Sequence, residues 1–76
     1  MAVRAYIFIE TDVGKSKEVA ANIRQLDKVK SVDLVTGPYD IIAIVEAENL
    51  HDVGDLITGN IHPITGISRT VTCLAV

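Results

Sequence analysis

The 76-residue chain carries seven Lys and Arg residues against ten Asp and Glu residues, which gives a formal net charge of −3. This balance disfavours direct nucleic-acid binding, because phosphate contacts need a concentrated basic face. The single cysteine, Cys73, excludes an internal disulfide, and the Cys/His clusters of a structural metal site are missing.

The length corresponds to one domain over residues 1–76, which buries only about 60% of the surface that its unfolded chain exposes. Self-association is the source of added stability that remains once disulfides and metals are excluded. Apolar residues make up 49% of the chain, but no apolar run approaches the roughly 18 residues of a membrane span. No signal sequence is recognisable either. We therefore expect a soluble, cytoplasmic protein that does not enter a membrane.

The first predicted strand covers Val3–Glu10, where β-branched and aromatic residues occur without Gly or Pro. The turn formers of "TDVGKS" follow it. A helix is predicted from Lys15 to Asp27, because Val19, Ile23 and Leu26 recur at helical spacing.

Two further strands, Val29–Thr36 and Asp40–Ala47, form a predicted hairpin around the turn "TGPYD". Asn49 is the predicted N-cap of a second helix, and Gly59-Asn60 is its predicted end. The last strand is predicted over Ile67–Val76. Apolar residues at helical spacing are expected on the inner face of the second helix: Leu50, Val53, Leu56 and Ile57, with Ile61 as a further candidate.

The predicted order is therefore βαββαβ, an α+β arrangement of two similar β-α-β halves. Right-handed crossovers turn this order into a four-stranded antiparallel sheet with both helices on one face, the ferredoxin-like fold.

The two central strands are predicted to be apolar on both faces. Tyr6 and Phe8 alternate with the inward residues of the first strand, and Ile42 and Ile44 do so in the third. Two helices can cover only one of these faces, and soluble monomers rarely expose an apolar patch of several hundred Å². We expect the second face to be covered by another copy of the sheet, in a face-to-face homodimer.

The segment "VKSVDLVTGPYDIIAIVEAENLHDVGDLI" resembles the effector domain of the Lrp/AsnC family of transcription factors, also called the RAM domain. The segment "ITGISRTVT" is similar to the ending of that domain, so that the resemblance covers essentially the whole chain. The family's helix-turn-helix domain has no counterpart ahead of the first strand. The resemblance thus predicts a stand-alone effector domain that does not bind DNA itself.

The resemblance further implies dimers through the open sheet faces, octameric or decameric rings, and an amino acid or related metabolite bound between dimers beside the turn. The expected role is non-enzymatic modulation of full-length Lrp/AsnC regulators by mixed assembly. No cofactor is implied.

The chemistry of the turn is consistent with such a ligand. Asp40 can accept hydrogen bonds from an ammonium group, and N–H groups near Gly37 and Tyr39 can donate to a carboxylate. Tyr39 could also wall the side-chain pocket. The predicted ligand-binding residues from the turn and the last strand are Thr36, Gly37, Tyr39, Asp40, Thr70 and Thr72, the two strand threonines coming from a neighbouring subunit.

A structural interpretation of the same residues is also open. Gly, Pro and Asp are ordinary turn residues, an aspartate can start a strand by bonding nearby N–H groups, and Thr70 and Thr72 are good strand formers. Cys73 is expected to be a small buried apolar residue. His51 and His62 are separated by a helix and are not expected to bind metal.

Three other functions remain open at this point. An ACT-type amino-acid sensor has the same element order, but places its ligand near the loop after the first strand. A small dimeric α+β barrel enzyme would need a cleft with a convergent catalytic set, which the residues do not provide. A purely structural oligomer is the last alternative.

Overall fold

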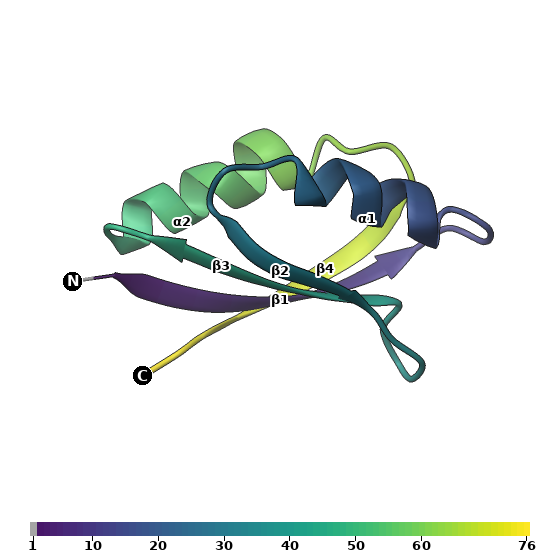
Figure 1. Ribbon diagram of the computed structural model, residues 1–76, viewed down its shortest axis with the longest axis horizontal. Coiled ribbons are helices and arrows are strands. Elements are labelled where there is room, and N and C mark those ends of the chain that lie inside the picture. Colours follow the sequence, from purple (N-terminus) through teal and green to yellow (C-terminus); the bar gives the residue numbers. More distant parts are fainter. Residues whose placement is uncertain (1) are drawn as a thin grey trace.

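The computed structural model describes residues 2–76, which form one sheet covered by helices on one side (Figure 1). The elements, in chain order, are β1 (Val3–Thr11), α1 (Ser16–Arg24), β2 (Val29–Leu34), β3 (Ile41–Ala47), α2 (Leu50–Leu56), a π-helical turn η1 (Ile57–Ile61) and β4 (Ile67–Leu74). The predicted βαββαβ order is confirmed, and the element bounds differ from the predicted ones by a few residues.

The sheet has the strand order β2-β3-β1-β4, and all neighbouring strands are antiparallel. Ile7 at the centre of β1 lies opposite Ala43 of β3 and Thr72 of β4. Both helices lie on the same face of the sheet, which is the ferredoxin-like arrangement predicted from the sequence (Figure 1). No helix of the described residues lies on the opposite face, which we call the open face.

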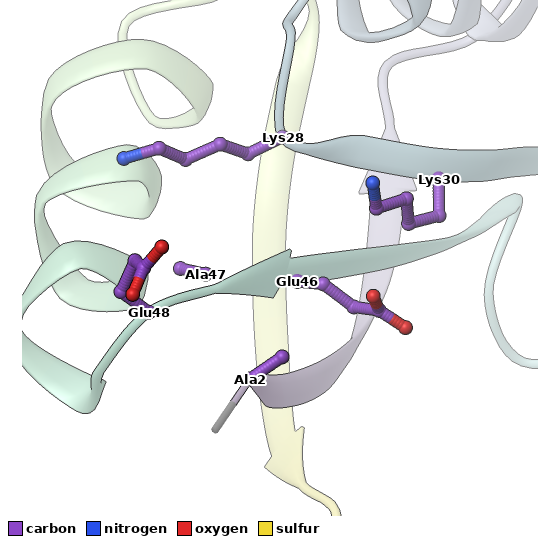
Figure 2. Close-up of a pocket in the computed structure, with 6 residues that line it drawn as sticks. All are labelled: Ala2, Lys28, Lys30, Glu46, Ala47 and Glu48. Carbon is purple, nitrogen blue, oxygen red and sulfur yellow. The ribbon is translucent and has the colours of Figure 1, made fainter.

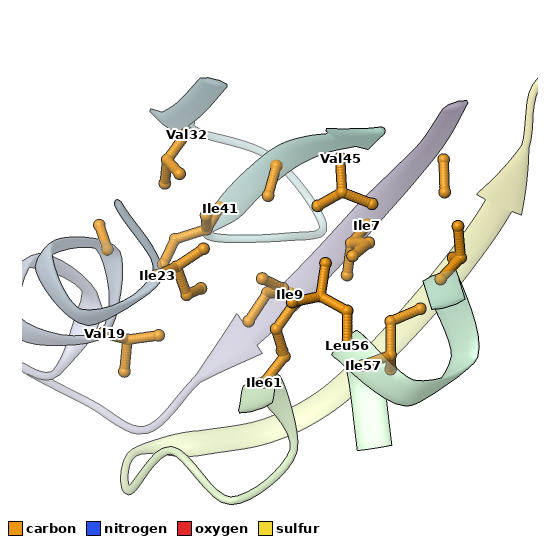
Figure 3. Close-up of a cluster of buried hydrophobic side chains, with 14 of the residues drawn as sticks. Ile7, Ile9, Val19, Ile23, Val32, Ile41, Val45, Leu56, Ile57 and Ile61 are labelled. Atoms are coloured by element: carbon orange, nitrogen blue, oxygen red, sulfur yellow. The ribbon is translucent and has the colours of Figure 1, made fainter. Parts of the chain in front are cut away.

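The core lies between the helices and the sheet (Figure 3). The largest side chains that are fully buried there come from β1, β3, α1, α2 and η1: Ile7, Ile9, Ile23, Ile41, Ile61, Val19, Val45 and Val53. Their alternation along β1 and β3 sends every second side chain into the core, as the two-residue period of a strand requires.

The start of α2 is fixed by a side-chain cap. The Asn49 side chain accepts a hydrogen bond of 2.9 Å from the backbone N–H of Asp52, which confirms the predicted N-cap. The prediction that Leu50 faces inward is wrong, because this first helical residue is 58% exposed. It follows the exposed residues Glu48 and Asn49, at the exposed start of the helix.

The predicted end of this helix at Gly59-Asn60 is also wrong. The backbone continues through both residues as η1, closed by a hydrogen bond of 2.8 Å from the N–H of His62 to the carbonyl of Ile57. Ile57 and Ile61 are both buried, so the wider π turn keeps two isoleucines in contact with the core. Among residues 2–76, no helix has the length and apolar character that crossing a membrane requires.

Candidate functional site

The open face consists of four cross-strand rows of side chains. Tyr6 lies between Ile44 and Cys73 in one row, and Phe8 lies between Ile42 and Val71 in the next. These two apolar rows are flanked by charged ones: Arg4 with Glu46 at one end, and Glu10 with Arg69 at the other. The prediction that the central strands are apolar on both faces is therefore confirmed.

Cys73 belongs to this face. It lies opposite Tyr6 and is exposed, so the prediction of a buried cysteine is wrong for the single chain. The reason is the alternation of β4: residues on the Cys73 side point away from the helices, toward the face that no helix of residues 2–76 covers.

At one end of the open face, the flanking pair is tightly bonded. Arg4 donates from Nε and Nη2 to the same oxygen of Glu46, at 2.9 and 2.7 Å. The hydrogen bond that Arg4 donates to the Glu46 carboxylate raises the pKa of the guanidinium above its ordinary value.

The connection between β2 and β3, residues 35–40, contains the "TGPYD" turn and bends away from the helices toward the open face (Figure 1). Its base is closed by a backbone hydrogen bond of 2.9 Å from the N–H of Val35 to the carbonyl of Asp40. Gly37 has a φ of +147°, a conformation that other residues adopt only with strain, and an added Cβ there would meet no other atom. The turn is thus exposed at its tip and anchored at its base.

Asp40 is the anchor. Its Oδ2 accepts hydrogen bonds from the backbone N–H of Thr11 at 2.8 Å and from Thr11 Oγ1 at 3.2 Å, and the same hydroxyl contacts Ser16 Oγ at 2.8 Å. The Asp40 N–H donates to the carbonyl of Ile9 at 2.9 Å. Among the described residues, Oδ1 of Asp40 has no side-chain partner. Oδ2 of Asp40 thus bonds Thr11 within the fold, while Oδ1 is available to accept a further hydrogen bond.

The "TGPYD" turn and the loop after β1 therefore lie at the same end of the sheet. The turn is the ligand site predicted for an Lrp/AsnC domain, and the loop is the one predicted for an ACT-type sensor. Thr11, the last residue of β1 before that loop, is bonded to Asp40. A ligand at one loop would therefore disturb the base of the other. Only the tips, Val13-Gly14 and Gly37-Pro38, can distinguish the two sites.

Tyr39 lies on the open face beside the last apolar row. Its ring centroid is 5.4 Å from that of Phe8, at an interplanar angle of 56°. Arg69 Nη2 donates to the Tyr39 hydroxyl at 3.2 Å, and Arg69 Nε bonds Glu10 Oε2 at 3.0 Å. Sequence reasoning missed Arg69 and Glu10. Strand alternation would have placed them on one face, but their pairing depends on the register between β1 and β4.

Thr70 and Thr72 occupy the other face. They lie opposite Ile9 and Ile7 of β1, whose side chains point into the core, so both threonines are on the helix side of β4. Thr70 Oγ1 contacts His62 Nε2 at 3.0 Å. Within one chain, therefore, the threonines do not meet Tyr39, and their contribution from a neighbouring subunit stays a prediction. Thr36 is exposed within the turn.

A separate hollow with a cavity volume of about 390 Å³ lies at the opposite end of the sheet (Figure 2). Its lining is Ala2, Lys28, Lys30, Glu46, Ala47 and Glu48. None of these residues was predicted to bind ligand. Among residues 2–76, no group of three or more His, Cys, Asp or Glu side chains is arranged to hold a metal ion.

Residues 4–76 match the family model of the Lrp/AsnC ligand binding domain. An uncharacterized HTH-type transcriptional regulator of Pyrococcus furiosus is 31% identical over 78 residues, covering 99% of this chain and 52% of the relative. The chain thus spans about half the length of the curated relatives it matches.

Two solved structures correspond to most of the chain at a similar length. A hypothetical protein from Pyrococcus horikoshii superposes with a TM-score of 0.92 at 35% identity, covering 97% of this chain and 89% of the other. A protein from Thermus thermophilus superposes with a TM-score of 0.93 at 31% identity, covering 97% and 92%. The family match over nearly all residues, together with this fold, shows that the chain belongs to the Lrp/AsnC family and carries its ligand-binding domain.

Proposed function

We propose that this chain binds an amino acid or a closely related metabolite at the "TGPYD" turn, and reports its presence to transcriptional regulators of the Lrp/AsnC family. The observation that carries the proposal is the state of Asp40. One oxygen of its carboxylate is fixed by Thr11, and the other has no side-chain partner among the described residues. A carboxylate held in this way is a ready acceptor for an ammonium group.

The surroundings of Asp40 suit the remainder of an amino acid. Gly37, Pro38 and Thr36 are exposed, so backbone N–H groups of the turn and the Thr36 hydroxyl can reach a ligand carboxylate. Gly37 has no side chain to obstruct that approach. Tyr39 provides an aromatic wall beside the site, and Thr70 and Thr72 supply hydroxyl groups from a neighbouring copy.

Two structures with the same fold support an amino acid as the first class of ligand to test. A transcriptional regulator of Neisseria meningitidis, 16% identical with a TM-score of 0.87, is a complex with L-Met. A feast or famine regulatory protein of Mycobacterium tuberculosis, 19% identical with a TM-score of 0.81, is a complex with L-methionine. At this identity they bear on the fold, so the ligand of the present chain has to be measured.

The proposed module acts as an assembly. The two apolar rows of the open face are half-buried or exposed in the single chain, and a second copy placed face to face would remove them from water. Such dimers are proposed to assemble into octameric or decameric rings, in which the turn of one dimer meets the threonines of another. This arrangement would complete the ligand site.

The proposed output is a protein contact rather than chemistry or DNA binding. The Lrp/AsnC ligand-binding domain is a regulatory domain, and the net charge of −3 does not favour contact with phosphates. We therefore propose a non-enzymatic effector module that enters mixed assemblies with full-length regulators and alters their binding to DNA.

Calorimetric titration with each proteinogenic amino acid tests the proposal. The informative variant is Asp40→Asn, which keeps an acceptor oxygen for Thr11 but removes the negative charge. Asp27→Asn is the matched control, because Asp27 is an exposed aspartate in the turn between α1 and β2. Saturable binding by the unmodified chain and by Asp27→Asn, lost in Asp40→Asn, supports the proposal. Equal binding by all three would exclude Asp40 as the ammonium acceptor.

A further inference from the structure

Four side chains from three parts of the chain form one connected group at the end of the open face. Phe8 and Glu10 come from β1, Tyr39 comes from the turn, and Arg69 comes from β4; we call this group the Tyr39 cluster. The guanidinium of Arg69 lies at its centre. Its Cζ is 5.8 Å from the centroid of the Tyr39 ring, in addition to its ion pair with Glu10 and its hydrogen bond to the Tyr39 hydroxyl.

Tyr39 links this group to the interior of the turn. The other hydrogen bonds that hold residues 35–40 involve only Val35 and Asp40, at the two ends of the connection. Thr36, Gly37 and Pro38 are exposed, and no hydrogen bond to another described residue holds them. Between Val35 and Asp40, Tyr39 is the half-buried residue, and its side chain packs against Phe8 on the sheet.

Arginine is suited to this position in a way that lysine is not. Arg69 uses Nε toward Glu10 and Nη2 toward Tyr39, so a single planar group bridges a carboxylate and a phenol. Its location near the aromatic ring adds a cation–π attraction. A lysine ammonium at the same place could satisfy these partners only as a point charge.

We infer that Arg69, oriented by Glu10, is a positioning residue for the "TGPYD" turn. It holds Tyr39 on the open face, and so keeps the backbone between Gly37 and Asp40 in the conformation that presents the free Asp40 oxygen. The consequence for ligand affinity rests on the proposed function. The structural consequence, that Arg69 holds the turn in place, is independent of the proposed function.

The structural consequence can be tested without any ligand. Hydrogen exchange measured by NMR reports on the amides of Val35, Asp40 and Thr11, whose hydrogen bonds close the base of the turn. In Arg69→Met their exchange should be faster by about two- to fivefold, the range expected for an exposed ion pair with an aromatic contact. Amides in the centre of β3 should be unchanged.

A matched control is available on the same face. Arg4 forms the corresponding pair with Glu46 at the opposite end, and the Arg4 and Arg69 side chains are 51% and 61% exposed. Arg4→Met should leave exchange at the turn unchanged, whereas a general effect on association of the open faces would appear in both variants. Equal exchange in Arg69→Met and Arg4→Met would overturn the inference.

A second substitution tests whether Arg69 acts through Tyr39. Tyr39→Phe removes the hydroxyl that accepts from Arg69 but keeps the ring against Phe8. Exchange in the double variant Tyr39→Phe/Arg69→Met should be slower than the product of the two single effects predicts, because the two residues share one interaction. Independent effects would contradict the proposed route.

Ligand titration separates this inference from the proposed function. If an amino acid binds, its Kd should rise by about two- to fivefold in Arg69→Met, with partial rescue in Arg69→Lys. An unchanged Kd would refute the link to ligand binding. If no amino acid binds the unmodified chain, the proposed function fails, and the exchange experiment still decides whether Arg69 positions the turn.

Discussion

The Asp40 carboxylate accepts a hydrogen bond of 2.8 Å from the backbone N–H of Thr11, and this contact joins the turn before β3 to the end of β1. Ser16, at the start of α1, contacts the Thr11 hydroxyl at 2.8 Å and extends the connection to the first helix. Asp40 therefore has a structural role in addition to its proposed role in the ligand site. Substitutions at this position must separate the two.

Asp40→Ala is expected to lower the free energy of unfolding by about 1 to 3 kcal/mol, because the Thr11 N–H loses its partner in a half-buried position. Asp40→Asn retains an acceptor and should lose about 1 kcal/mol or less. Urea denaturation at one fixed protein concentration measures both, since assembly makes stability depend on concentration. Asp27→Ala, at an exposed position between α1 and β2, should change stability by no more than about 0.5 kcal/mol. Equal free energies of unfolding for Asp40→Ala and Asp40→Asn would show that the hydrogen bond to Thr11 does not contribute to stability.

Gly66 is expected to be less tolerant of substitution than Gly37. Both have positive φ values, +104° and +147°, but a Cβ at Gly66 would lie 3.0 Å from Val19 Cγ2 and 3.1 Å from Lys15 Cβ. Gly66→Ala should therefore destabilise the chain by about 1 to 3 kcal/mol, and Gly37→Ala by about 1 kcal/mol from backbone strain alone. Thermal or urea unfolding of the two variants gives the comparison. A larger destabilisation by Gly37→Ala than by Gly66→Ala would mean that Val19 and Lys15 move aside at little energetic cost.

The open face is expected to be an assembly surface. Ile44→Lys places a charge in the middle of an apolar row, beside Tyr6. In a face-to-face dimer that charge would be buried without a partner, so the mass in solution should fall toward that of a single chain. Asn22→Lys adds the same charge to the exposed surface of α1 and serves as the control. An unchanged mass for Ile44→Lys, measured by light scattering, would place the interface elsewhere.

The ion pair between Arg4 and Glu46 should not make stability depend on pH in the neutral range. The hydrogen bond to Glu46 raises the pKa of Arg4 in the folded state. The contribution of the pair to the free energy of unfolding is therefore fully present below the pKa that Arg4 has in the unfolded chain. It is lost only as the pH rises through the still higher folded pKa, in strongly alkaline solution. The pH dependence of unfolding between about pH 6 and pH 9 should be the same for Arg4→Met and the unmodified chain. A different slope would indicate that a neighbouring group titrates with the pair.

Periodicity predicted most of the fold because it reflects burial directly. The alternation in β1 and β3 and the spacing of Val19 and Ile23 correspond to the observed core. The errors occur where burial depends on what lies nearby rather than on spacing. Leu50 is spaced like the inward residues of the second helix but lies at its exposed start. The π-helical turn continues past Gly59 because Ile57 and Ile61 pack into the core.

The candidate site was only partly predictable for a similar reason. Turn chemistry and the family resemblance singled out Gly37, Tyr39 and Asp40, which are adjacent in the sequence. The contacts of Asp40 with Thr11 and of Tyr39 with Arg69 join residues about thirty positions apart. Such pairs are fixed by strand register and by the path of the turn, and neither follows from composition or local pattern.

The most direct measurement is an NMR titration of the unmodified chain with the amino acids, starting with L-methionine, in which the amide signals of both loop tips are followed. Saturable shifts at Gly37, with Val13 and Gly14 unaffected, are the predicted result. Shifts at Val13 and Gly14 without a shift at Gly37 would contradict the assignment of the turn and place the ligand at the loop after β1.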